Sequence, residues 1–351
     1  EVSCMLCLAA THATGATRKS TVFAVSNFRY FLRAGTPRVS GFSRKYPSFC
    51  TTDCPVMSPS SSEFSSLAEG RNVVPVMMFL GGGNMARALI DGAVTSGFAT
   101  KEEIAVSVRS EQSAQRWKNE GFTKVFTNNN EMLSLYGAGI LYICVKPQIY
   151  ERVVAEFKTD ILQDCPIVVS IMAGVKISDI VEKLTDSGYS QPVIRLMPSM
   201  PCQVRASASI VTSQAGLTDQ QLSLVTSLAK KVGTCTVVDE KAFDAAAAVA
   251  SCGPAFIFVL IEAMADGGVL CGLPRADALA LATQTVIGAA QLVQQSGLHP
   301  AVLKDQVCSA GGSTIAGVRA LEKCGARSAL IEAVKASTER AGEMGKKEPG
   351  K

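Results

Sequence analysis

The spacing of apolar residues changes twice along the chain and divides it into three regions. Residues 1–70 show no periodic apolar spacing, whereas 71–238 alternate short apolar runs with segments of helical spacing. Strands are predicted at 73–80, 104–108, 124–126, 139–145 and 167–171. Helices are predicted from the glycines at 81–83 to Gly97, at 111–119 and after Pro147. This alternation predicts a parallel sheet with helices on both faces, which is a Rossmann-type α/β domain.

Residues 239–345 lose the strand signals and form a succession of alanine-rich helical segments. Helices are predicted at 241–250, 255–270, 275–295, 301–308, 314–323 and 328–342. The segment 275–295 is apolar on nearly all sides, which in a soluble helix requires burial by neighbouring helices or by a second subunit. A homodimer through this all-α domain is therefore a hypothesis. No transmembrane helix is predicted, because Gly253-Pro254 interrupts one apolar stretch and polar residues interrupt the other.

The first region has two interpretations. Residues 2–52 contain seven basic side chains and no acidic one, with many Ser and Thr, which is typical of an organelle transit peptide. The same composition fits an upstream extension that is untranslated or wrongly assigned to the protein. The first interpretation places the protein in a mitochondrion or plastid and the second in the cytoplasm, so localisation stays open. Residues 58–66, rich in Ser and Pro, are predicted to be a linker.

Charge and cysteine content indicate which ligands the chain binds and the redox state of its thiols. The net charge of +4 comes mostly from the first seventy residues, so no basic stripe indicates nucleic acid and small metabolites are the favoured ligands. Twelve cysteines at irregular spacing indicate free thiols in a reducing compartment. Cys4 and Cys7, and Cys50 and Cys54, are closely spaced, but only His12 lies near them. A closed zinc site needs four ligands, so no metal site is predicted.

A glycine-rich turn directly follows the first predicted strand and opens the first helix. Gly81, Gly83 and Ala86 match the pattern G-x-G-x-x-A, with Gly82, Asn84 and Met85 between them. Glycines there permit a tight turn and let backbone N–H groups approach a pyrophosphate at the positive end of the helix. We therefore predict a dinucleotide site, with an ordinary tight turn as the alternative.

The ends of later strands bear on the choice of cofactor. An acidic residue after the second strand would bind the ribose of NAD, but the chain has Arg109 and Ser110 there, which would receive a 2′-phosphate. NADPH is therefore the predicted cofactor, with NADH possible. Val145, Lys146 and Pro147 close the fourth strand at the edge where ligands of doubly wound folds lie. Lys146 is either a cofactor contact or a surface lysine at a strand end.

A second glycine turn lies in the helical region. Gly311 and Gly312 are followed by Ser313 and Thr314 at the start of a predicted helix. Exposed backbone N–H groups, two hydroxyl groups and the helix dipole together favour an anion such as a carboxylate. Ser313 is also suited to cap the helix, and capping and anion binding are compatible.

Taken together, these motifs resemble the pyrroline-5-carboxylate reductase family over residues 74–344. The strings that carry the resemblance are FLGGGNMARALI, VKPQ, IVVSIMAGV, VIRLMPSMP, CGPAFIFVLIEAMADGGVLCGLPR and LKDQVCSAGGSTIAGVRALE. The glycine loop is shared with many dehydrogenases, whereas GPAF, ADGGVxxGLPR and GGSTIAG in this order are more specific. The chain departs from the usual family residues at Ala310, Ser199, Met200 and Cys252, and none of these changes removes a group that the chemistry requires.

The resemblance implies a Rossmann domain and a helical dimerisation domain, with each active site between the cofactor and helices of the dimer. It implies further cofactor contacts at Asn129, at the end of the third strand, and at Ala173 and Gln306. It implies substrate contacts at Ser309, Gly312, Ser313 and Thr314, and at Glu240.

The implied reaction is hydride transfer from NAD(P)H to the imine carbon of pyrroline-5-carboxylate, which gives proline. The Gly312 to Thr314 backbone would hold the substrate carboxylate, and the catalytic Thr314 hydroxyl would face the ring nitrogen. Two alternatives remain: a hydroxyacid dehydrogenase of similar build and a non-catalytic NADPH-binding sensor. A dehydrogenase needs a base, usually a helical lysine, yet residues 242–295 contain none. That absence favours an imine substrate.

Overall fold

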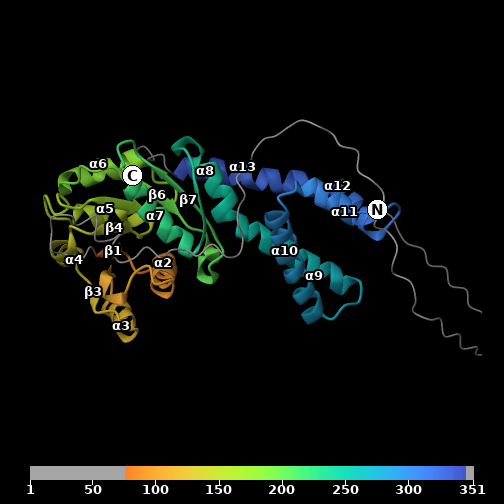
Figure 1. Cartoon of the computed structure of the whole chain (residues 1–351), viewed down its shortest axis with the longest axis horizontal. Coiled ribbons are helices and arrows are strands. Elements are labelled where there is room, and N and C mark those ends of the chain that lie inside the picture. Colours follow the sequence, from red (N-terminus) through yellow and green to blue (C-terminus); the bar gives the residue numbers. More distant parts are fainter. Residues whose placement is uncertain (1–75, 345–351) are drawn as a thin grey trace, which may run out of the picture. The chain divides into compact units, whose positions relative to one another are not determined.

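A computed structural model describes residues 76–344 of the chain (Figure 1). The predicted N-terminal extension, its linker and its four closely spaced cysteines lie outside these residues. The strands are β1 (Met77–Leu80), β2 (Ile104–Ser107), β3 (Lys124–Phe126), β4 (Ile140–Ile143), β5 (Ile167–Ser170), β6 (Val193–Met197), β7 (Ser207–Ser213) and β8 (Gly233–Val237). The helices of this part are α2 (Asn84–Thr95), α3 (Glu111–Asn119), α4 (Asn129–Tyr136), α5 (Pro147–Ala155), α6 (Ile177–Leu184) and α7 (Asp219–Lys231).

The eight strands form one sheet in the order β3-β2-β1-β4-β5-β6-β7-β8. Neighbouring strands are parallel, except that β7 runs antiparallel to β6. The five predicted strands pair in parallel, as predicted, and the antiparallel pair lies between two strands that were not predicted. Only the short 3-10 helix η4 (Met200–Val204) and its flanking residues connect the two strands. A parallel return needs a crossover of a dozen or more residues, so the chain can only reverse here.

Helices cover both faces of the sheet, as predicted. Side chains of a strand alternate between faces, so Met77 and Phe79 pack with α2, α3 and α7, whereas Met78 and Leu80 pack with α4, α5 and α6. The five predicted strands are all present within two residues of their predicted ends, apart from residues 73–75, which are not described. The sequence analysis did not identify β6, β7, β8, α4, α6 and α7.

The remaining chain is helical, as predicted. Its helices are α8 (Phe243–Ala247), α9 (Gly253–Leu270), α10 (Arg275–Ser296), α11 (Pro300–Val307), α12 (Ser313–Lys323) and α13 (Ala326–Met344). A predicted break at Gly253-Pro254 is wrong, because a π-helical turn, η6 (Ala248–Cys252), joins α8 to α9. Wider π-type hydrogen bonding accommodates a proline that has no N–H to donate.

Two of these helical stretches are largely exposed. Residues 240–270 and 275–296 are long and apolar enough to cross a membrane by length and composition, and few of their residues are buried within the chain. Phe258, Val259, Leu270 and Leu281 are among the large apolar side chains left exposed there. Buried packing between α9 and α10 is limited to Ala265, Ala278 and Ala282 and their neighbours. These helices therefore present an apolar surface that is not covered by the other residues of the described range 76–344.

Candidate active site

The glycine turn after β1 has the geometry of an anion-binding loop. Gly81 adopts φ +105°. A Cβ atom at this position would lie 3.0 Å from the carbonyl oxygen of Cys144, the residue that follows β4. The Gly81 N–H donates to the Ser107 carbonyl oxygen at 2.9 Å, which ties the turn to β2. Gly83 is the N-cap of α2 and has open space where a side chain would be. The helix start has no side-chain cap, so its N–H groups are available to a pyrophosphate.

Trp117 of α3 supports the turn from behind. A side chain at Gly82 would approach Trp117 Nε1 at 2.6 Å and Val108 Cγ1 at 2.7 Å. The Arg87 guanidinium lies 4.3 Å from the centroid of the Trp117 ring and also pairs with Glu120. The indole ring thus packs directly against the backbone of Gly82, and only a residue without a side chain permits this close approach.

The predicted ribose contacts follow β2. Arg109 and Ser110 are exposed, and the Ser110 side chain caps α3 by accepting from the Ser113 N–H at 3.3 Å. Asn129 is the first residue of α4 rather than the end of β3, but it reaches the same edge, because Ser107 Oγ donates to Asn129 Oδ1 at 2.6 Å. These residues therefore surround the end of β2, where the adenosine half of a dinucleotide binds.

The ends of β4 and β5 continue this edge. Lys146 is exposed and is the N-cap of α5, with Val145 and Pro147 half-buried beside it. Burial raises the pKa of the Cys144 thiol well above its usual range, so it stays protonated at neutral pH. Ala173 is exposed in the turn after β5, where Gly174 adopts φ +72°. These residues lie at the carboxyl ends of β4 and β5, the edge of the sheet at which doubly wound folds bind their ligands.

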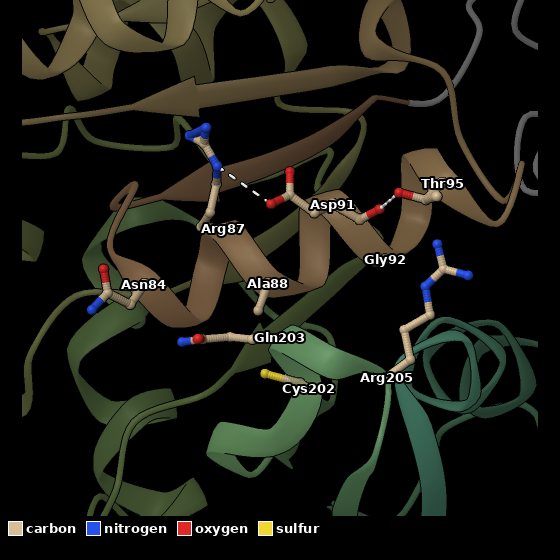
Figure 2. Close-up of a pocket in the computed structure, with 9 residues that line it drawn as sticks. All are labelled: Asn84, Arg87, Ala88, Asp91, Gly92, Thr95, Cys202, Gln203 and Arg205. Atoms are coloured by element: carbon tan, nitrogen blue, oxygen red, sulfur yellow. Dashed lines mark hydrogen bonds and ion pairs between the residues drawn. The ribbon is translucent and has the colours of Figure 1, made fainter. Parts of the chain in front are cut away.

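A polar groove of about 520 Å³ begins beside the glycine turn and follows one face of α2 (Figure 2). Figure 2 shows Arg87 reaching toward Asp91, and their atoms Nε and Oδ2 are 3.4 Å apart. Cys202 and Arg205 face α2 from the opposite wall of the groove, at η4. The Cys202 thiol lies 3.7 Å from the Met85 sulfur, so η4 packs directly on the predicted cofactor loop.

The two departures from the family pattern at η4 differ in environment. Ser199 is buried, and its Oγ accepts from the Ala208 N–H at 3.0 Å while its own N–H donates to Ser207 Oγ at 3.0 Å. Met200 is exposed. Ser199 therefore stabilises the connection between β6 and β7.

The second glycine turn connects α11 to α12 as predicted. Gly311 adopts φ +67°, and Gly312 is the N-cap of α12 without a side-chain cap, so the first N–H groups of this helix are also available. A side chain at Gly312 would meet Ser309 Oγ at 2.3 Å. Ser313 is exposed and Thr314 is half-buried at the first two helical positions. This arrangement suits a carboxylate with a hydroxyl group beside it.

The chain does not bring its two glycine turns together. The backbone hydrogen bonds of residues 308–312 stay within α11, the turn and α12, and α12 packs mainly against α13. Gln306, a predicted cofactor contact, is exposed on α11 beside the same turn. The predicted site residues therefore form two groups, one at the carboxyl edge of the sheet and one at the start of α12.

Glu240 belongs to neither group. Its Oε1 accepts from Arg195 Nη1 at 2.7 Å and from the Ile177 N–H at 3.4 Å. Asp244 lies 3.9 Å from Arg195 Nη2, and the Arg195 guanidinium lies 3.9 Å from the centroid of the Phe243 ring. Arg195 is not among the residues predicted from the sequence, although a single charged residue inside the apolar run VIRLM is a signal of a buried ion pair.

No group of three or more possible metal-ligating side chains occurs among residues 76–344.

Two family models match the chain. One described as pyrroline-5-carboxylate reductase dimerisation matches residues 240–344, and one described as NADP oxidoreductase, coenzyme F420-dependent, matches residues 76–174. The pyrroline-5-carboxylate reductase of Arabidopsis thaliana is 40% identical over 266 residues, which are 76% of this chain and 94% of the relative. The Escherichia coli enzyme of the same name is 35% identical over 268 residues, or 76% of this chain and 97% of the relative.

Solved structures agree with these relatives. A pyrroline-5-carboxylate reductase from Coxiella burnetii superposes with a TM-score of 0.69 at 28% identity, covering 78% of this chain and 99% of that one. Plasmodium falciparum pyrroline carboxylate reductase with NADP bound gives a TM-score of 0.68 at 28% identity, covering 78% of this chain and 98% of that one.

Proposed function

Because the chain belongs to the pyrroline-5-carboxylate reductase family, we propose that it reduces the imine of 1-pyrroline-5-carboxylate to L-proline with NADPH. The observation that carries the proposal is the Gly311-Gly312-Ser313-Thr314 turn at the uncapped start of α12. It offers N–H groups to the one carboxylate of the substrate and a hydroxyl group to the adjacent nitrogen. A second uncapped helix start, at α2, serves the cofactor.

The chain's own residues bind and orient the reactants. Bound NADPH supplies the hydride, which goes to the imine carbon. The backbone N–H groups of Ser313 and Thr314 hold the carboxylate, and the Thr314 hydroxyl accepts a hydrogen bond from the protonated ring nitrogen. That nitrogen keeps its proton and takes the electron pair of the C=N bond as the carbon receives hydride. No metal or strong general acid is required, since orientation supplies most of the assistance.

A second copy of the chain is part of this proposal. Within one chain the substrate turn and the cofactor edge form separate groups, and α9 and α10 leave large apolar side chains exposed. The matched dimerisation model covers the same residues, 240–344. We therefore assign the exposed apolar face to a homo-oligomer interface, in which the α12 turn of one copy meets the cofactor edge of another.

The proposal also divides the chain. Residues 71–238 form the dinucleotide-binding domain, 239–345 form the helical substrate and dimerisation domain, and 1–70 are dispensable for catalysis. Removal of residues 1–70 should leave cofactor affinity and kcat unchanged.

The direct test is a steady-state assay. Purified protein, pyrroline-5-carboxylate and NADPH should consume NADPH and form proline in equal amounts, with the product identified by amino-acid analysis. A 3-hydroxy acid with NADP⁺ serves as the control substrate and should give no turnover. Turnover of the hydroxy acid would favour a dehydrogenase, and NADPH binding without turnover of either substrate would indicate a sensor.

A further inference from the structure

Arg195 is the one charged side chain that is fully buried among residues 76–344, with 3% of its surface exposed. It projects from the middle of β6, packs on the Phe243 ring and pairs with Glu240 and Asp244 at the start of the helical region. Its Nε has no hydrogen-bond partner among the described residues. Both partners are about a third exposed, so solvent screens the two ion pairs and neither contributes much net stability by itself.

The partners of Arg195 lead to the turn after β5. Arg195 pairs with Ser170, the last residue of β5, in the register of the sheet. The following turn, residues 171–177, is held at its start by the Ile171 N–H, which donates to the Ile143 carbonyl oxygen at 3.1 Å. At its end, the Ile177 N–H donates to Glu240 Oε1, the same oxygen that accepts from Arg195. Ala173, a predicted cofactor contact, is exposed between these two anchors.

A cavity of about 390 Å³ lies directly beside this turn. Its lining includes Ala173 and Gly174 of the turn, Arg195, Phe243 and Ser251. Ser251 belongs to the π-helical turn η6, and such turns are frequent at functional sites. The Met172 N–H also donates to Ser170 Oγ at 3.3 Å, so the start of the turn is held by β5, and the part that follows Ala173 is held at Ile177.

We infer that Arg195 and Glu240 are positioning residues, which hold the 171–177 turn against the nicotinamide half of the cofactor. This inference rests on the proposed function and gives Glu240 a role through the turn instead of the direct substrate contact that the family resemblance implied. Arg195 fixes the Glu240 carboxylate from the sheet, and the carboxylate fixes the N-terminus of α6. Loss of either side chain frees the later end of the turn, at Ile177.

Two ligands separate this role from a general loss of structure. NADPH spans both halves of the cofactor edge, whereas adenosine 2′,5′-bisphosphate contains only the half that binds near Gly81 and Arg109. In Arg195→Met and Glu240→Ala, NADPH affinity should fall between about twofold and tenfold, the equivalent of one net hydrogen bond. Affinity for the bisphosphate should stay unchanged. The value of kcat should fall by up to about 100-fold, as expected for misplacement by about an ångström.

Glu240→Gln is the conservative variant, since its amide oxygen still accepts from the Ile177 N–H, and it should retain most of the NADPH affinity. Leu228→Ala is the control for stability: Leu228 is buried on the opposite face of the sheet, and its loss should lower the melting temperature without changing either affinity. The ratio of the two affinities is a binding measurement, so it remains informative if the wild-type protein proves inactive toward pyrroline-5-carboxylate. Equal weakening of both ligands, or an unchanged NADPH affinity in Arg195→Met and Glu240→Ala, would overturn the inference.

Discussion

Trp117 lies directly behind Gly82 of the cofactor loop, so close that a side chain on Gly82 would approach the indole Nε1 at 2.6 Å. It is the only tryptophan in the chain. Its fluorescence therefore reports on the cofactor loop alone, and NADPH, which absorbs light emitted by tryptophan, should quench it on binding.

Gly82→Ala should disrupt this contact. The added methyl group must displace Trp117 or Val108, and overpacking of this kind costs about 1–3 kcal/mol. We expect NADPH affinity, measured by Trp117 quenching, to fall by about tenfold. Gly83→Ala is the matched control, because open space surrounds a methyl group there, and its loss of affinity should be smaller. A wild-type NADPH affinity in Gly82→Ala would mean that packing of the indole against the loop does not determine the position of the loop.

Arg109→Asp should change the choice of cofactor. Arg109 is exposed at the end of β2, beside Asn129 and Ser107. A carboxylate there repels a 2′-phosphate and bonds to a ribose hydroxyl, so NADPH affinity should fall by about tenfold or more while NADH affinity is kept. The measurement is the ratio of kcat/KM for the two cofactors. Equal losses for both would show that Arg109 does not face the ribose.

Alkaline pH should destabilise the protein in part through Cys165. Burial is the main cause that raises the pKa of its thiol from 9.0 to about 12. Between these values the unfolded chain releases the proton and the folded chain keeps it, so the free energy of unfolding falls as pH rises. One such group contributes about 1.4 kcal/mol per pH unit. Cys165→Ala should flatten the decline measured by denaturant unfolding, whereas Cys324→Ala, at an exposed position, should leave it unchanged.

The parts of the fold that follow from local pattern were predictable. The strands β1 to β5 are buried apolar runs between turns, and the glycine turns at Gly81 and Gly311 require conformations that few other residues adopt. The antiparallel pairing of β7 was not, because it follows from the short connection at η4 rather than from the composition of either strand. The continuation of the helix through Pro254 depends on π-type hydrogen bonds that no periodicity reveals.

The candidate site also contains features that the sequence predicts and features that only the folded structure reveals. Glycine and hydroxyl positions at helix starts could be recognised from sequence, because the chemistry of a helix N-terminus is local. The link from Arg195 through Glu240 to Ile177 joins residues from three distant segments, so only the folded chain reveals it. The separation of the two glycine turns within one chain is likewise visible only in the folded structure, although the apolar composition of residues 275–295 had already suggested a second subunit.

Thr314 provides the most direct test of the chemistry. It is the second residue of α12, half-buried, and the preceding Gly312 leaves the helix start without a side-chain cap. Thr314→Ala keeps every backbone N–H that holds the carboxylate and removes the hydroxyl group that faces the nitrogen, together with the γ-methyl group. The hydroxyl group orients the protonated nitrogen and transfers no proton, so its loss should lower kcat through misplacement of the imine carbon, by up to about 100-fold.

A change at Gly312 has the opposite effect, because it leaves the Thr314 hydroxyl group in place and alters the backbone that holds the substrate carboxylate. Gly312→Ala pushes a methyl group against Ser309 Oγ, which should raise KM for pyrroline-5-carboxylate more than it lowers kcat. Thr314→Ser should retain most activity, and neither variant should change NADPH affinity by Trp117 quenching, because both changes alter groups assigned to the substrate and leave the residues of the cofactor loop intact. A Thr314→Ala enzyme with wild-type kcat would leave the turn as a carboxylate cradle only, since a hydroxyl group that assists the reaction must be missed most in the transition state.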